Sequence, residues 1–275
     1  MTRHRPTTRT HGGRTHGGRP PIFIVVAAIF GAAVFLLPFL ALIVRAPWGH
    51  ARAIVAEPDI RTALRLSMVC SVSATAISMV FGIPLAWVQA RLVFPGRALL
   101  RAITTLPVVL PPVVGGLALL LAFGRNGILG RYLYDWFSIR LPFTTAGAIV
   151  AEAFVSMPFF VLSMEGAFAT ADQRYDEAAA TLGASRATIL WRITLPALGP
   201  ALVASAVLCW ARALGEFGAT ITFAGNFPGT TQTAPLAVYQ AFETNPDAAI
   251  MLSLLLVAVS LIVLMSLRHR LIAKA

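Results

Sequence analysis

Long apolar runs separated by short polar segments dominate the chain. An α-helix rises about 1.5 Å per residue, so about 20 apolar residues cross a hydrocarbon core of about 30 Å. Six runs reach this length, four of them without a charged side chain. The pattern predicts an all-α polytopic membrane protein with six transmembrane helices at about 22–44, 66–90, 102–124, 143–168, 197–222 and 248–267.

The composition excludes a soluble protein. Of the 275 residues, 57% are hydrophobic and only 12% are charged. Soluble domains carry about 25% charged residues, so this chain has too few charges to cover a water-exposed surface. Residues 1–21, which repeat Thr-His-Gly-Gly-Arg, are too polar to bury a core. We therefore expect a disordered basic tail at 1–21, followed by a transmembrane domain at 22–275.

The net charge of +11 indicates orientation. In a soluble protein it would suggest nucleic acid, but in a membrane protein basic residues gather on the cytoplasmic side. With the N-terminus inside, 14 of the 22 basic residues are cytoplasmic, seven are outside and Arg212 lies within a span. We expect a multi-pass protein of the cell (plasma or inner) membrane in contact with the lipid bilayer, with both termini cytoplasmic and no nucleic-acid partner.

The segment 172–196, between the fourth and fifth predicted spans, has the pattern of two short helices joined at a glycine. Asp172 and Ser185 are suited to cap the two helices, and Gly183 is suited to a left-handed position between them. Pro196 either ends the second helix or begins the following span. By itself, this pattern also fits an amphipathic connector on the membrane surface.

The spacing within this segment is more specific than a connector requires. It resembles the signature loop of ABC-transporter permeases of binding-protein-dependent importers. In that pattern Glu-Ala-Ala is followed by Gly after three intervening residues, by Ile after nine more, and by Leu-Pro after one more. The matching residues are Glu177, Ala178, Ala179, Gly183, Ile193, Leu195 and Pro196. The resemblance implies the type I importer permease fold and a cytoplasmic coupling loop that docks onto a separate ATPase.

Further segments resemble one subgroup of that family. The stretches 94–97, 106–115 and 213–220 resemble molybdate permeases and their sulfate relatives, and the stretch 221–233 favours the molybdate permeases. The resemblance implies a molybdate importer, with sulfate, thiosulfate or tungstate as alternatives. It also implies a homodimer of this chain, two ABC ATPase subunits and an extracytoplasmic molybdate-binding protein. Alternating access, driven by the ATPase through loop 177–196, is the implied mechanism.

The chain has no visible catalytic motif of its own. A phosphate-binding loop needs Lys followed by Ser or Thr, but the single lysine, Lys274, precedes Ala275. No Cys, His and carboxylate cluster resembles a metal site. We expect a non-enzymatic subunit without cofactor or metal, with ATP and Mg²⁺ bound by the partner ATPase. A secondary transporter would need no ATPase, but it often shows inverted repeats and none is convincing here.

Charges and prolines within the predicted spans identify candidate pathway or gate residues. Arg212 and Glu216 are four residues apart and can form a salt bridge that is either structural or part of a gate. The segment around Pro111, Pro112 and Gly115 is either a packing kink or a hinge that lines the path. The hydroxyls of Thr220 and Thr222 either conduct an oxyanion or form hydrogen bonds within their own helix. The carboxylates of Glu152 and Glu165 are interior hydrogen-bonding groups or helix-end groups.

Overall fold

The computed structural model describes residues 21–272 and their side chains up to residue 265. The described residues form helices, turns and loops without a strand, as the sequence predicts. The predicted tail at 1–21 lies almost entirely outside them. The chain divides into two compact units, one that ends at Arg45 and one that begins at Ala46.

In the first unit, the described helix is α1 (Ile22–Arg45), which covers the predicted span 22–44. Its apolar side chains point in all directions, and none of its residues is buried within the chain. A helix that is hydrophobic all round requires lipid or another protein around it.

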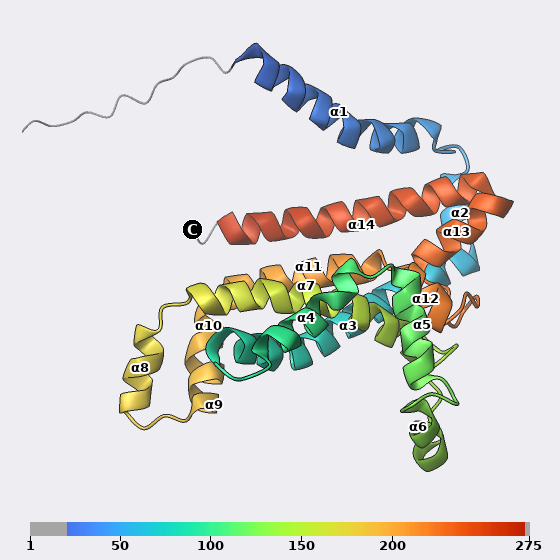
Figure 1. Cartoon of the computed structure of the whole chain (residues 1–275). Helices are drawn as coiled ribbons and strands as arrows, with labels where there is room; N and C mark the ends of the chain where they lie inside the picture. The colour runs from blue at the N-terminus through green and yellow to red at the C-terminus, as the bar shows by residue number, and fades with distance from the viewer. Residues whose placement is uncertain (1–20, 273–275) are drawn as a thin grey trace, which may run out of the picture. The chain divides into compact units, whose positions relative to one another are not determined.

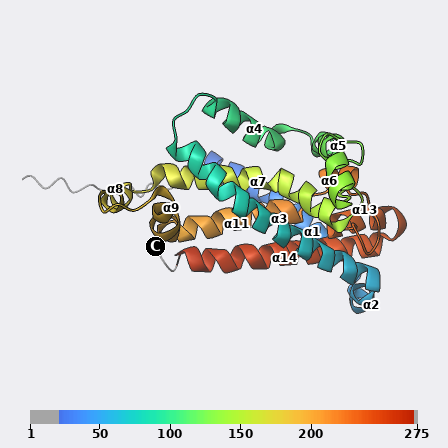
Figure 2. The ribbon, with the colours of Figure 1, turned by 90° about the horizontal axis from the view of Figure 1, so that it is seen from below.

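The second unit is built on four long helices: α3 (Pro58–Arg91), α7 (Thr145–Thr170), α11 (Gly199–Leu214) and α14 (Pro246–Ile272). They run side by side in both views (Figures 1 and 2). α3 and α7 lie close together at Gly82, where a Cβ would lie 2.7 Å from the ring of Phe160. Phe160, Met164 and Phe168 are fully buried there and fill the core between α3, α7 and α11.

The predicted span 102–124 is not one helix. The chain forms α4 (Arg97–Val109) and α5 (Pro112–Phe123), whose axes are bent by 119°. Leu110 is extended between them, because a proline disfavours the helical conformation of the residue before it. Pro111 and Pro112 also lack the N–H groups that a continuous helix would need. The prediction of a single helix was therefore wrong at this span.

The predicted span 197–222 is also interrupted. α11 ends at Leu214, and α12 (Gly218–Phe223) follows after a break at residues 215–217. The prediction that Arg212 and Glu216 share a helix was wrong, since Glu216 follows the end of α11. At the other end of α11, the axis bends by 82° from the preceding short helices.

Among the described residues, four helices are long and apolar enough to cross a membrane, and the number is six if each bent pair counts as one span. The connecting segments contain α2 (Ala51–Ala56), α6 (Gly130–Phe137) and α13 (Ala234–Thr244). In both views the helices of the segment 172–196 lie at one end of the bundle, whereas α5 and α6 lie at the other (Figures 1 and 2).

Candidate functional site: the coupling loop and the polar helix break

The segment 172–196 has the predicted helix–glycine–helix conformation. α8 (Arg174–Thr181) begins where the Arg174 N–H donates to Asp172 Oδ1 at 3.0 Å. Gly183 has a φ of +86°, a left-handed conformation that side chains rarely adopt. α9 (Arg186–Ile189) begins where the Thr188 N–H donates to Ser185 Oγ at 3.2 Å. The Ser185 cap and the left-handed glycine are confirmed. Asp172 accepts the first N–H of α8, but the residue at the N-cap position is Gln173, whose side chain makes no capping hydrogen bond.

The segment then enters the bundle through a π-helix, η1 (Leu190–Thr194), and the short α10 (Leu195–Ala197). Pro196 lies in α10, one residue before the continuous helical segment Arg186–Ala197 ends, so it marks the end of the second helix rather than the start of α11. Leu190 and Leu195 are buried against Phe168 and the rest of the core between α3, α7 and α11. This part of the segment is therefore fixed to the bundle.

The signature residues divide into an exposed half and an anchored half. Glu177, Ala178 and Gly183 are exposed, whereas Leu195 is buried. Of the others, Ala179 and Ile193 are half-buried and Pro196 is exposed. Tyr175 and Leu182 add exposed apolar area beside the alanines, with 67% and 89% of their surfaces accessible. An exposed apolar surface rimmed by charges is typical of a protein–protein contact.

Asp176 joins three elements at the base of the segment 172–196. Its Oδ1 accepts a hydrogen bond from the Thr194 hydroxyl of η1 at 3.0 Å. Its Oδ2 lies 3.5 Å from Nη2 of Arg91, the last residue of α3. Thr194 is only 4% exposed, and the Arg91 side chain only 12%. We call Asp176, Arg91 and Thr194 the loop brace; sequence reasoning did not single it out.

A cavity of about 350 Å³ lies beside the brace. Its polar lining comes from Arg91, Gln173, Asp176, Glu177 and Arg186. The signature carboxylate of Glu177 therefore borders both the exposed face of α8 and the space between α8 and α3.

A second cluster forms where α5 crosses α12. A Cβ on Gly116 would lie 2.8 Å from the Ala219 carbonyl oxygen, and a Cβ on Gly218 would lie 2.8 Å from Pro112 Cβ. The two backbones can approach so closely only because both positions are glycine. Pro112 thus contacts the helix that carries the candidate threonines.

The other two candidates of the α5 segment lie outside this crossing. Gly115 is buried against Phe154 of α7, and Pro111 is exposed before the start of α5.

Arg212 and Glu216 form an ion pair across the break between α11 and α12. Arg212 Nη1 lies 2.6 Å from Glu216 Oε2, and Glu216 is 1% exposed. The other oxygen, Oε1, accepts the N–H of Ala219 at 2.9 Å and so caps α12. Arg212 also lies over the ring of Phe159, 5.9 Å from its centroid. Both charges are therefore engaged, and the pair fixes the geometry of the break.

The remaining polar groups inside the bundle have different roles. The Thr222 hydroxyl donates to the Gly218 carbonyl of its own helix at 2.8 Å. The Thr220 hydroxyl and the Oε2 atom of Glu152 are buried without a hydrogen-bond partner in the described part of the chain. Glu165 forms an ion pair with Arg101 and ties α4 to α7. Thr220 is thus the candidate hydroxyl that remains available to a polar ligand or water.

Comparison with known proteins gives the family. Residues 78–275 match the family described as binding-protein-dependent transport system inner membrane component. The molybdenum transport system permease protein ModB of Mycobacterium tuberculosis is 46% identical over 252 residues, which cover 91% of this chain and 94% of that protein. ModB of Escherichia coli K12 is 42% identical, with 77% and 93% covered. The sulfate transport system permease protein CysT of Salmonella typhimurium is 36% identical, with 86% and 87% covered.

Solved structures agree with this fold. A bacterial ABC transporter involved in the import of the acidic polysaccharide alginate superposes with a TM-score of 0.70 at 18% identity, covering 90% of this chain and 93% of that chain. The methionine ABC transporter MetNI, in an inward-facing conformation, superposes with a TM-score of 0.58 at 19% identity, covering 86% and 98%. The chain therefore belongs to the inner membrane components of binding-protein-dependent transport systems and has the ABC importer permease fold.

Proposed function

We propose that this chain is the transmembrane permease subunit of an ATP-driven molybdate importer. The support is the similarity to the two ModB proteins, 46% and 42% identical over most of the chain. Sulfate is the second candidate substrate, because the sulfate permease CysT is 36% identical over a similar length. Tungstate and thiosulfate, which are related oxyanions, complete the candidates.

The proposed assembly has two copies of this chain, two ABC ATPase subunits and an extracytoplasmic molybdate-binding protein. One structural neighbour is an alginate ABC transporter in complex with its ligand-bound periplasmic protein. ATP and Mg²⁺ belong to the ATPase in this proposal, and this chain contributes no nucleotide site. With the coupling loop in the cytoplasm, the C-terminal end of α14 is cytoplasmic too, since both lie at the same end of the bundle (Figures 1 and 2).

The observation that carries the proposal is the two-part construction of the coupling loop. Its exposed half, around Glu177 and Gly183, presents a surface for the ATPase. Its anchored half, through Leu195 and the loop brace, is fixed to α3, α7 and α11. Movement imposed on α8 is thus passed to the bundle as a rigid-body motion. Alternating access follows if the ATPase interacts differently with the inward- and outward-open states.

The polar cluster around the helix break suits passage of an anion better than tight binding. A free guanidinium in the bundle would hold a dianion strongly and slow its release. Arg212 is neutralised by Glu216 at 2.6 Å, so the cluster leaves hydroxyls such as that of Thr220 for weaker contacts. Specificity for molybdate then resides mainly in the binding protein. In this proposal the translocation path of the anion lies along the two-fold axis of the homodimer.

Replacing Gly183 by leucine tests the proposal. A side chain at φ +86° is strained by about 1–2 kcal/mol, and leucine adds bulk to the docking surface. We expect Gly183→Leu to insert into membranes but to lose both ATPase co-purification and uptake of radiolabelled molybdate. Gly166→Leu is the matched control, because Gly166 is exposed on α7 and a Cβ there meets open space. Unchanged uptake by Gly183→Leu would refute the coupling role and favour a transporter that needs no ATPase.

A further inference from the structure

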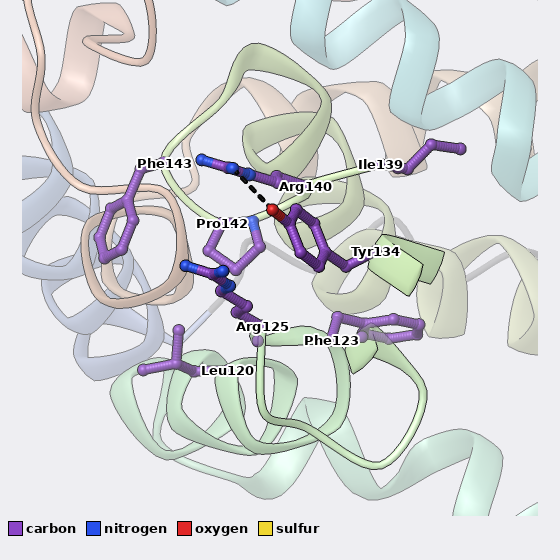
Figure 3. Close-up of a pocket in the computed structure, with 10 residues that line it drawn as sticks. Leu120, Phe123, Arg125, Tyr134, Ile139, Arg140, Pro142 and Phe143 are labelled. Carbon is purple, nitrogen blue, oxygen red and sulfur yellow. Dashed lines mark hydrogen bonds between the residues drawn. The ribbon is translucent and has the colours of Figure 1, made fainter. Parts of the chain in front are cut away.

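Two arginines share one tyrosine ring at the end of the bundle opposite the coupling loop. The guanidinium carbon of Arg125 lies 4.6 Å from the centroid of the Tyr134 ring, and that of Arg140 lies 4.9 Å from it. Arg140 Nη2 also donates to the Tyr134 hydroxyl at 3.1 Å. Figure 3 shows both side chains beside Tyr134, with their guanidinium groups directed toward the part of the pocket near Phe143. We call Arg125, Tyr134 and Arg140 the arginine fork.

The fork carries positive charge without a carboxylate partner. No Asp or Glu of the described residues lies within ion-pair distance of Arg125 or Arg140. Basic residues are disfavoured on the outer side of a membrane protein, where the proposed orientation places the fork. The tyrosine ring restricts both cations through cation–π contacts, so part of the entropy cost of ordering them is already met before a ligand arrives.

The pocket beside the fork restricts what that ligand can be. It has a volume of about 270 Å³, and its other walls are mostly apolar, from Leu120, Phe123, Ile139, Pro142 and Phe143. Such walls cannot replace the hydration shell of a free dianion such as molybdate. They do fit a protein loop that presents a carboxylate to the arginines and an apolar side chain to the pocket.

One wall of the pocket is held in a strained conformation. Phe143 has a φ of +62°, which is rare for a bulky residue and costs conformational energy. Its ring contacts that of Phe227 edge to face, with centroids 6.1 Å apart, and this contact helps to hold it in place. The pocket shape is therefore set before a partner binds.

We propose that the arginine fork receives an aspartate or glutamate of the extracytoplasmic binding protein, and that an apolar side chain of the same loop enters the adjacent pocket. The inference rests on the proposed function, because it requires a binding protein. It adds a defined contact on the outer surface: Arg125 and Arg140 bind the carboxylate, and Tyr134 is the positioning residue that holds them.

The test is binding of the importer's own molybdate-loaded binding protein to the permease–ATPase complex in lipid nanodiscs. We expect the double variant Arg125→Gln/Arg140→Gln to weaken this affinity by about tenfold or more, mainly through faster dissociation, and to reduce its salt dependence. Tyr134→Ala keeps both charges but removes their support, so we expect a smaller loss, with Tyr134→Phe close to wild type. Arg52→Gln/Arg61→Gln is the matched control, since it also removes two exposed positive charges, one from α2 and one from α3.

The outcomes separate this inference from the proposed function. If the wild-type complex does not bind the binding protein, the proposed function fails. If the wild type binds and the double variant binds equally tightly, the fork is not the docking contact and the inference is overturned. Unchanged docking together with impaired uptake would also overturn it, in favour of a site for the free anion. Co-purification of the ATPase with each variant verifies folding.

Discussion

Removing the Asp176 carboxylate should uncouple ATP hydrolysis from transport. The carboxylate contacts both Arg91 at the end of α3 and Thr194 in η1. Asp176→Ala therefore removes both of these polar contacts from α8, while the exposed residues Glu177 and Gly183 remain available to the ATPase. We expect the ATPase to bind and hydrolyse ATP, with less of the resulting motion passed to the bundle.

The size of the effect follows from the contacts. A hydrogen bond to a charged group contributes about 1.5–3 kcal/mol, and a partly exposed ion pair adds at most about 1 kcal/mol. Loss of the hydrogen bond and the ion pair shifts the equilibrium from the braced toward the released loop by roughly 2–4 kcal/mol. Each 1.4 kcal/mol changes the equilibrium constant by a factor of about ten. The released state, rare in the wild type, then competes with the braced state.

The assay is the number of ATP molecules hydrolysed per molybdate imported into proteoliposomes that contain the permease and ATPase, with the binding protein supplied. We expect this number to rise several-fold in Asp176→Ala and in Thr194→Val. The double variant should be no worse than Asp176→Ala alone, because both changes remove the same hydrogen bond. Asp172→Asn is the control, since it keeps a side-chain oxygen for the Arg174 N–H and removes only the charge of a carboxylate that is 56% exposed and 4.0 Å from an exposed Arg174. A wild-type ratio in Asp176→Ala, or fully additive effects in the double variant, would refute the brace.

Three further predictions concern other parts of the molecule. Gly116→Val should lower the free energy of unfolding by about 1–3 kcal/mol through overpacking of α5 against α12, as measured by thermal unfolding in detergent, whereas Gly166→Val should not. Arg212→Met should lower the free energy of unfolding by about 3–5 kcal/mol, because the substitution leaves the buried Glu216 carboxylate unpaired. A smaller loss in Arg212→Met/Glu216→Leu would show that the unpaired charge is the cause. The hydrogen bond and charge of Arg140, with the charge of Arg125, lower the pKa of Tyr134, so its tyrosinate form should appear at lower pH than in an ordinary tyrosine. Ultraviolet titration against Tyr134→Phe measures this pKa, which should rise in Arg140→Gln; an unchanged pKa would contradict the contact.

Local signals in the sequence predicted much of the fold. The apolar runs located the long helices of the described residues, and the cap at Ser185 follows from residue type, as does the left-handed Gly183. Prolines marked the position of the sharp bend at Leu110, but they do not show whether a helix kinks or stops. The end of α11 at Leu214 was missed, because a single glycine at 215 is tolerated in many helices.

Contacts between distant residues could not be predicted in the same way. Asp176 stands beside the signature glutamate, yet its role depends on Arg91 at the end of another helix. The arginine fork likewise depends on how α6 and the segment after it fold back on Arg125. In both cases the residues were visible in the sequence, but their partners are set by tertiary packing rather than by spacing.

Uptake into proteoliposomes tests the central claim most directly. The permease is reconstituted with its ATPase, the binding protein is supplied outside, ATP is enclosed, and radiolabelled molybdate is followed in the presence of unlabelled molybdate, tungstate or sulfate. We predict that uptake of radiolabelled molybdate requires both ATP and the binding protein. An equal concentration of sulfate should not reduce this uptake. Uptake without ATP would contradict the ABC permease function, and displacement of molybdate by sulfate would contradict the substrate.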